Sequence, residues 1–178
     1  MLPVNQSKAP VISIVMPVRN EARHIERCLR QIFIQKISFP YEIIIIDSGS
    51  TDSTLEIIRG LKNPRIRIKE IPAEQFGHGR TRNLGAHLSK GEYLVFLNGD
   101  AFPLNHRWLH ELYQEVNRNE KTIAAFSRHI PRRDCHLYMQ RDIYNAFPNS
   151  GREQTRKLSF RTLLFSTVSC IIRRHIFL

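Results

Sequence analysis

The sequence predicts an α/β fold, with a mostly parallel sheet that helices flank on both faces. Apolar runs at 11–16, 41–46 and 93–97 are too short for helices, and the first two are rich in β-branched residues, so all three are predicted to be buried strands. Segments at 20–35 and 53–61 carry apolar residues at helical spacing. Strands and helices therefore alternate, as they do in a parallel sheet built from βαβ units.

The elements follow one another in a simple order. A polar leader covers residues 1–10, and the first strand at 11–16 stops before Pro17. Asn20 and Glu21 begin the first helix, where a cap and an acidic side chain are favourable. The later elements are a strand at 65–69, a flexible loop from 77–79, helices at 82–88 and 105–119, a basic and loop-rich tract at 128–161, and a last strand at 167–172.

Length and composition favour one globular domain. The chain has 178 residues, of which 42% are hydrophobic and 24% charged. Its net charge of +11 predicts attraction to phosphates, nucleic acids or an anionic membrane face. Neither a membrane-spanning run nor a signal-peptide pattern is visible, so the expected location is the cytoplasm, with peripheral contact at the inner face of the membrane as an option.

Polar side chains cluster after three predicted strands. The segments are 19–21, 47–52 and 98–100. Carboxyl ends of neighbouring parallel strands meet at one edge of a sheet, which predicts one shared ligand site. The alternative is that Asn20, Asp47 and Asp52 cap helices, which is the safer interpretation for any one of them alone. An acid directly after each of two apolar strands favours a ligand, because a buried carboxylate needs a partner such as a cation or hydroxyl groups.

Two further segments point to phosphate chemistry. Asn98 and Asp100 offer oxygen ligands for Mg²⁺ or Mn²⁺, although an Asn-Gly-Asp sequence alone is usually only a turn. The segment 77–85 places three glycines, two arginines and His78 before a helix, which suits a loop that closes on a phosphate. The contribution of His78 is the weakest of these, since a single loop histidine is commonly only solvated.

The motifs at 13–21 and 47–54 together resemble the start of the family 2 glycosyltransferases, which have the GT-A fold. Residues 76–85 and 94–101 resemble the rhamnosyltransferase-like branch of that family. The likeness extends over most of residues 11–174. It implies one GT-A domain over 11–178 that is incomplete at its C-terminus.

The resemblance also implies roles for individual residues. The residues that would line the nucleotide pocket are Pro17, Arg19, Asn20 and Glu21. Asp47 and Ser48 would hold the base or ribose, and Asp52 would brace that loop. Arg82 and Asn83 would lie beside the donor. Asn98, Gly99 and Asp100 fall on the family's Asp-x-Asp motif, which binds the metal that bridges the diphosphate. Asn98 replaces the first acid, and an amide oxygen binds a hard cation more weakly than a carboxylate does.

The implied reaction is inverting transfer of a sugar from a UDP- or dTDP-linked donor to a saccharide or lipid-linked acceptor, in cell-surface polysaccharide synthesis. The family's general base would follow the strand at 167–172, and the later acids Asp134, Asp142 and Glu153 do not match its motif. The catalytic residue therefore stays unassigned. The alternatives are a nucleotide-sugar-binding domain without turnover and, less favoured, a basic nucleic-acid-binding domain, because stacking aromatics are not interleaved with the basic residues.

Overall fold

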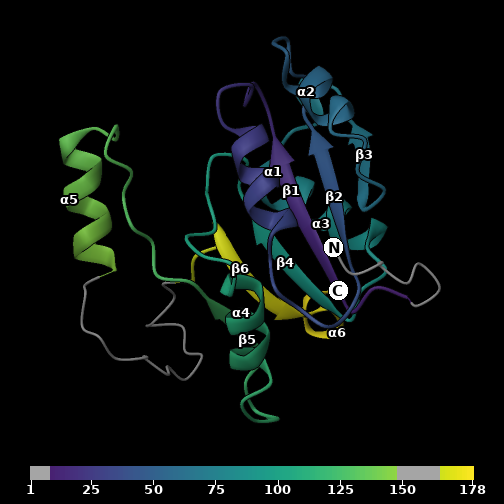
Figure 1. Ribbon diagram of the computed structural model, residues 1–178, viewed down its shortest axis with the longest axis vertical. Helices are drawn as coiled ribbons and strands as arrows, with labels where there is room; N and C mark the ends of the chain where they lie inside the picture. The colour runs from purple at the N-terminus through teal and green to yellow at the C-terminus, as the bar shows by residue number, and fades with distance from the viewer. Residues whose placement is uncertain (1–8, 148–164) are drawn as a thin grey trace.

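The computed structural model describes residues 9–147 and 165–178 (Figure 1). Six strands form one sheet in the order β3-β2-β1-β4-β6-β5. Four of these strands are parallel: β1 (Ile12–Val18), β2 (Tyr41–Asp47), β3 (Ile66–Glu70) and β4 (Tyr93–Leu97). The predicted α/β class, with a mostly parallel sheet, is therefore confirmed.

Burial explains why these runs form central strands. Every residue of β2 and β4 is buried, so both faces of these strands are covered and their apolar sequences need no polar alternation. In contrast, β3 lies at the edge of the sheet and alternates partly buried with exposed residues. The register pairs Val18 with Asp47, which brings the carboxyl ends of β1 and β2 together.

Helices cover both faces of the sheet. One face carries α1 (Ile25–Phe33), α2 (Thr54–Gly60) and α4 (Trp108–Val116), and the other carries α3 (His78–Leu88) and α6 (Arg174–Phe177). The apolar residues of α1 that sequence spacing selected, Ile25, Cys28, Leu29 and Ile32, are fully buried against the first face. Within the described ranges no helix is long and apolar enough to cross a membrane.

The second half of the chain differs from the sequence prediction. β6 (Ser169–Arg173) pairs antiparallel with β4, and β5 (Ala124–Phe126) pairs antiparallel with β6. Neither β5 nor α5 (Leu137–Ala146) was predicted, because β5 is only three residues long and α5 has no buried residue to give it a strong apolar stripe. Helix α5 projects from the body of the molecule (Figure 1). Part of the basic tract at 128–161 lies outside the described residues, and Glu153 is in that part.

Two helix starts were also misplaced. Helix α3 begins at His78 rather than at residue 82, so the segment 77–79 is the first turn of a helix instead of a flexible loop. Helix α1 begins at Ile25, after a turn, and its start is not capped by Asn20. A short 3-10 helix, η1 (Ala73–Gln75), precedes α3.

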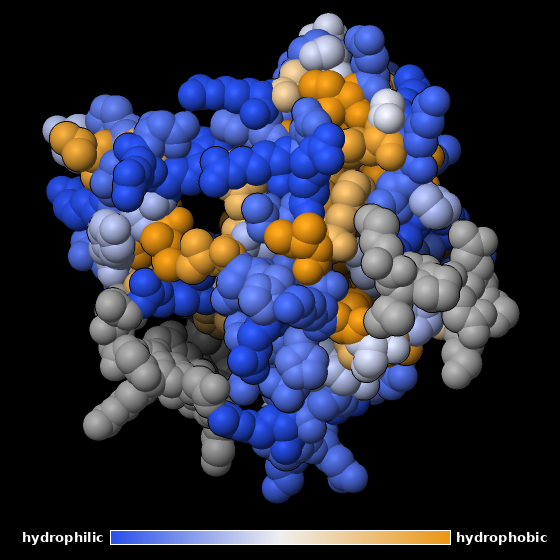
Figure 2. All heavy atoms as spheres, viewed as in Figure 1, coloured by the Kyte–Doolittle hydropathy of each residue, from blue (hydrophilic) through white to orange (hydrophobic). Residues whose placement is uncertain are grey.

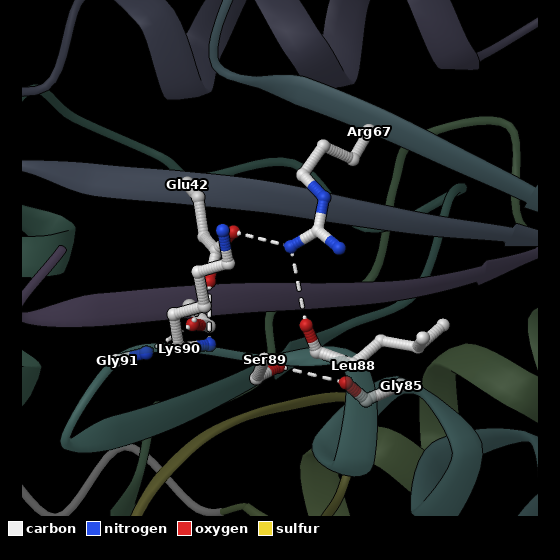
Figure 3. Close-up of polar contacts among 8 residues, drawn as sticks. Glu42, Arg67, Gly85, Leu88, Ser89, Lys90 and Gly91 are labelled. Atoms are coloured by element: carbon white, nitrogen blue, oxygen red, sulfur yellow. Dashed lines mark hydrogen bonds and ion pairs between the residues drawn. The ribbon is translucent and has the colours of Figure 1, made fainter. Parts of the chain in front are cut away.

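A polar network ties the amino ends of the strands together (Figure 3). Glu42 accepts hydrogen bonds from Ser13 Oγ at 2.7 Å and from the Lys90 backbone N–H at 2.7 Å. Arg67 Nη1 donates both to Glu42 at 2.9 Å and to the Leu88 carbonyl at 3.1 Å. This network joins β1, β2, β3 and the α3–β4 loop at the edge of the sheet opposite the polar strand ends.

Candidate functional site

Most of the predicted site residues lie at the carboxyl ends of β1, β2 and β4, which are adjacent in the sheet, and the others lie on α3. Three segments meet there: 19–22 after β1, 47–54 from the last residue of β2 onward, and 98–102 after β4. The Ser48 backbone N–H donates to the Val18 carbonyl at 3.0 Å, which continues the pairing of β1 and β2 into the loops. The shared edge that sequence reasoning expected is present.

The first two segments are joined by hydrogen bonds. The Asn20 side-chain oxygen accepts from the Thr51 backbone N–H at 2.8 Å, and the Asn20 N–H donates to Ser50 Oγ at 2.9 Å. Asn20 has a φ of 54°, in the left-handed region that asparagine tolerates better than most residues. Asn20 therefore links two loops, and the alternative that it caps α1 is wrong.

Asp52 also connects these loops. One carboxylate oxygen accepts from the Thr54 backbone N–H at 3.0 Å, at the start of α2, and the other accepts from the Ala22 N–H at 3.1 Å. The Thr54 hydroxyl also donates to the Asp52 carboxylate. This hydrogen bond, together with those from the backbone, lowers the pKa of the Asp52 carboxyl. Capping and bracing thus coexist in one side chain.

Asp47 is satisfied within its own turn. Its side chain is buried at 1% exposure and accepts from the backbone N–H groups of Gly49 and Ser50, each at 3.0 Å, and from the Ser50 hydroxyl. The argument that this buried carboxylate needs an external partner is therefore wrong, because the chain supplies one. Next to it, the fully buried Ser48 hydroxyl has no hydrogen-bond partner in the described part of the chain.

The turn after β4 lies against the loop after β1. A Cβ atom on Gly99 would come within 3.1 Å of Glu21 Cγ and 3.1 Å of Val18 Cγ1, so only glycine fits there without displacing these side chains. Burial, together with the carboxylates of Asp100 and Asp52, raises the pKa of Glu21 to about 6. Acids from all three segments are thus close enough to repel one another.

Arg82 connects α3 to the same turn. Its Nη2 donates to Asn98 Oδ1 at 2.9 Å and its Nη1 to the His78 carbonyl at 2.9 Å. Arg82 is 8% exposed, and burial lowers the pKa of its guanidinium. Arg82, expected from the resemblance to lie beside the donor, therefore contacts Asn98 directly.

The other predicted residues lie at the margin of this edge. Arg19, His78 and Asn83 are exposed, and Pro17 is partly buried in β1. The His78 ring contacts Phe76 edge-on, with centroids 5.1 Å apart. In this structure, His78 reaches the Asn98 turn only through its backbone carbonyl, which accepts from Arg82.

One basic residue near the site was missed. Arg132 Nη1 donates to the Asp100 carbonyl at 3.3 Å, and its guanidinium lies 5.7 Å from the centre of the Phe102 ring. Arg132 also pairs with Asp134, which in turn pairs with Arg23 of the first loop. The basic tract was a signal that cations gather in this region, but no spacing in the sequence distinguishes Arg132 from its neighbours.

The donor set fits a divalent cation through Asp100. Its exposed carboxylate is a hard oxygen ligand beside the Glu21 carboxylate, and a cation would relieve their mutual repulsion. Asn98 fits less well, since its oxygen already accepts from Arg82. No group of three or more His, Cys, Asp or Glu side chains with metal-binding geometry occurs among the residues that the structure describes.

Comparison with known proteins adds an independent result. The family model "Glycosyl transferase family 2" matches residues 13–178. The chain is 38% identical over 107 residues to glycosyltransferase AglE of Haloferax volcanii, covering 58% of this chain and 34% of AglE. It is 32% identical over 115 residues to the poly(ribitol-phosphate) beta-N-acetylglucosaminyltransferase TarP of Staphylococcus aureus, covering 63% of this chain and 35% of TarP. The chain thus spans about a third of the length of these relatives.

Solved structures agree on the fold. The mannosyltransferase PcManGT from Pyrobaculum calidifontis, in complex with GDP-Man and Mn²⁺, superposes with a TM-score of 0.67 at 20% identity, covering 96% of this chain and 46% of that one. Glucosyl-3-phosphoglycerate synthase from Mycobacterium tuberculosis, in complex with UDP, gives 0.62 at 19% identity, with coverages of 94% and 58%. At these identities the likeness establishes the fold alone.

Proposed function

The chain belongs to the family 2 glycosyltransferases, and we propose that it is the donor-binding part of an enzyme that transfers a sugar from a nucleoside diphosphate. The observation that carries this proposal is the meeting of segments 19–22, 47–54 and 98–102 at one edge of the sheet, with acids from all three and amide side chains from the first and the last. Structural neighbours solved in complex with GDP-Man and with UDP support a nucleotide as the ligand.

Each segment has a role in this proposal. Asp47 shapes the turn after β2, so that this turn and Ser48 receive the base or ribose. Pro17, Arg19, Asn20 and Glu21 line the pocket on one side, with Asp52 as brace. Arg82 and Asn83 of α3 face the donor from the other side, together with His78.

Asp100 would hold the divalent cation. When bound, the cation supplies positive charge to the leaving diphosphate. The chain's own cationic side chains add to this positive charge, because Arg82 and Arg132 both donate hydrogen bonds to the Asn98–Asp100 turn. A carboxylate that deprotonates the acceptor hydroxyl is not assigned to any residue of this sequence.

The finer parts of the proposal concern stereochemistry and partners. Transfer would proceed with inversion, from a UDP- or dTDP-linked sugar to a saccharide or lipid-linked acceptor, in cell-surface polysaccharide synthesis. The net charge of +11 supports peripheral contact with an anionic membrane, and Figure 2 shows hydrophilic side chains over much of one face of the molecule. Rhamnosyl specificity stays a prediction from the motifs at 76–85 and 94–101.

Substitution of Asp100 tests the central claim. Asp100→Ala should abolish the additional thermal stabilisation that Mn²⁺ gives in the presence of UDP, GDP or dTDP, because the cation loses its carboxylate ligand. Since Asp100 is exposed, the ligand-free melting temperature should stay within about 2 °C. Differential scanning fluorimetry with and without Mn²⁺ measures both quantities.

The matched control is Asp142→Ala, which removes an exposed carboxylate from α5. It should leave the Mn²⁺ effect intact. An unchanged Mn²⁺ effect in Asp100→Ala would contradict the cation assignment. Radiolabelled sugar transfer then separates the enzyme from the alternative of a binding domain without turnover, which predicts donor binding with no product.

A further inference from the structure

Arg82 is held in one orientation by its surroundings. It lies in the second turn of α3, is 8% exposed, and donates to the Asn98 side chain and to the His78 carbonyl, each at 2.9 Å. Its Nε has no hydrogen-bond partner in the described part of the chain. A buried guanidinium with two fixed bonds has little freedom to turn, so whatever it holds is also fixed.

The bond to Arg82 decides how the Asn98 amide is oriented. A guanidinium can only donate, so the atom that faces it must be the carbonyl oxygen Oδ1. The Nδ2 group therefore faces away from Arg82, and no described residue accepts a hydrogen bond from it. Asn98 is only partly buried and stands at the carboxyl end of β4, two residues before Asp100.

We infer that Asn98 is a hydrogen-bond donor to an oxygen of the bound nucleoside diphosphate, that Arg82 is the positioning residue that orients it, and that Asn98 is not a ligand of the cation. This inference rests on the proposed function. It replaces the expectation that Asn98 Oδ1 ligates the metal. Oδ1 already accepts the Arg82 Nη2–H bond at 2.9 Å, and a divalent cation bound to the same oxygen would be repelled by the positive guanidinium.

The same geometry gives a physical reason for asparagine at this position. An aspartate would form a charged pair with Arg82 and present a second anionic oxygen to the diphosphate. The amide instead keeps an acceptor for Arg82 and turns two N–H donors outward. Donors suit phosphate and ribose oxygens, whereas the cation is left to Asp100.

Isothermal titration calorimetry with UDP, GDP and dTDP, each in EDTA and in Mn²⁺, tests the inference. In EDTA, Asn98→Ala should weaken the affinity for whichever nucleotide binds wild type by about 3- to 10-fold, which corresponds to the loss of one hydrogen bond. Asn98→Asp should weaken it more, because a donor becomes an anion. In both variants the factor by which Mn²⁺ tightens binding should match that of wild type.

Arg82→Lys examines the positioning role. A lysine keeps the charge but cannot reach both the Asn98 oxygen and the His78 carbonyl as the planar fork does. Arg82→Lys should weaken nucleotide binding in EDTA about as much as Asn98→Ala does. The double variant should show no further loss of affinity, since both changes remove the same interaction. A merely structural role of Arg82 predicts additive losses instead.

Asn119→Asp and Asn119→Ala are the matched controls, on an exposed turn after α4, and should leave every affinity unchanged. The inference is overturned if Asn98→Ala binds like wild type in EDTA, or if Asn98→Asp increases the Mn²⁺ factor, as a cation ligand would. If wild type binds none of the three nucleotides with or without Mn²⁺, the proposed function fails and the inference fails with it.

Discussion

The acidic residues at the polar edge fall into two groups, according to whether their carboxylates accept hydrogen bonds from the chain. Asp47 and Asp52 are used by the chain itself, because their oxygens accept backbone hydrogen bonds in the turns that they shape. Glu21 and Asp100 differ, since neither carboxylate accepts a hydrogen bond from the residues that the structure describes. The acids that remain available for a ligand are therefore not the most buried ones.

The protonation of Glu21 should change stability with pH. Burial, together with Asp100 and Asp52, raises its pKa from 4.5 to about 6 in the folded protein. A raised acid pKa means that the protonated form favours folding, so this contribution is present below pH 4.5 and is lost as the pH rises through 6. The free energy of unfolding should contain a component that falls by roughly 1 kcal/mol across that window.

Glu21→Gln removes this component, because the amide does not titrate. Urea unfolding in EDTA between pH 4 and 7 should show that the variant gains on wild type as the pH rises from 4.5 to 6. Glu56→Gln, on the exposed surface of α2, provides the reference for the loss of one charge. A Glu21→Gln difference that is the same at every pH would contradict the argument.

At the scale of elements, the packing of α3 on β1 sets the position of Arg82. A Cβ atom on Gly85 would lie 2.3 Å from Val15 Cγ1, far inside van der Waals contact. A glycine at position 85 is thus explained by a close helix–strand approach, one turn from Arg82, which contacts Asn98.

Gly85→Ala should therefore force α3 away from β1. We expect a loss of about 1–3 kcal/mol in the free energy of unfolding and weaker nucleotide binding, because Arg82 moves with its helix. Gly60→Ala is the control, since no atom lies within 4 Å of a Cβ there and alanine is the better helix former. Urea unfolding of both variants measures the difference, and equal stabilities would refute the close approach.

The sequence predicted elements well where burial leaves a periodic signal. The continuous apolar runs of β1, β2 and β4 and the apolar stripe of α1 identify those elements, and polar residues at three strand ends locate the edge where the site lies. The pattern of β6 identifies a strand but not its direction, because alternation is the same in parallel and antiparallel pairs. Partnerships such as Arg82 with Asn98 or Arg132 with Asp100 depend on tertiary packing, which residue spacing does not encode.

At the scale of the whole molecule, the two ends of the sheet carry different polar networks. The carboxyl edge holds the acids and amides of the proposed site, while the amino edge is closed by Glu42, which is 8% exposed (Figure 3). Asp47 is the fifth residue after Glu42 in β2, a distance of about 16 Å along the strand. The amino edge can therefore be weakened without touching the site.

Glu42→Ala should lower the free energy of unfolding by roughly 2–4 kcal/mol, because it leaves the Ser13 hydroxyl and the Lys90 N–H without their acceptor and Arg67 without its carboxylate. Nucleotide affinity should stay within about twofold of wild type below the unfolding transition. Glu70→Ala removes an equivalent carboxylate from an exposed pair with Arg59 and should cost less than about 1 kcal/mol. Urea unfolding measures the stabilities, and calorimetry with UDP, GDP and dTDP measures the affinities. Equal losses of unfolding free energy in the two variants would show that the buried network adds nothing to stability. A loss of nucleotide affinity in folded Glu42→Ala would show that the two edges are coupled.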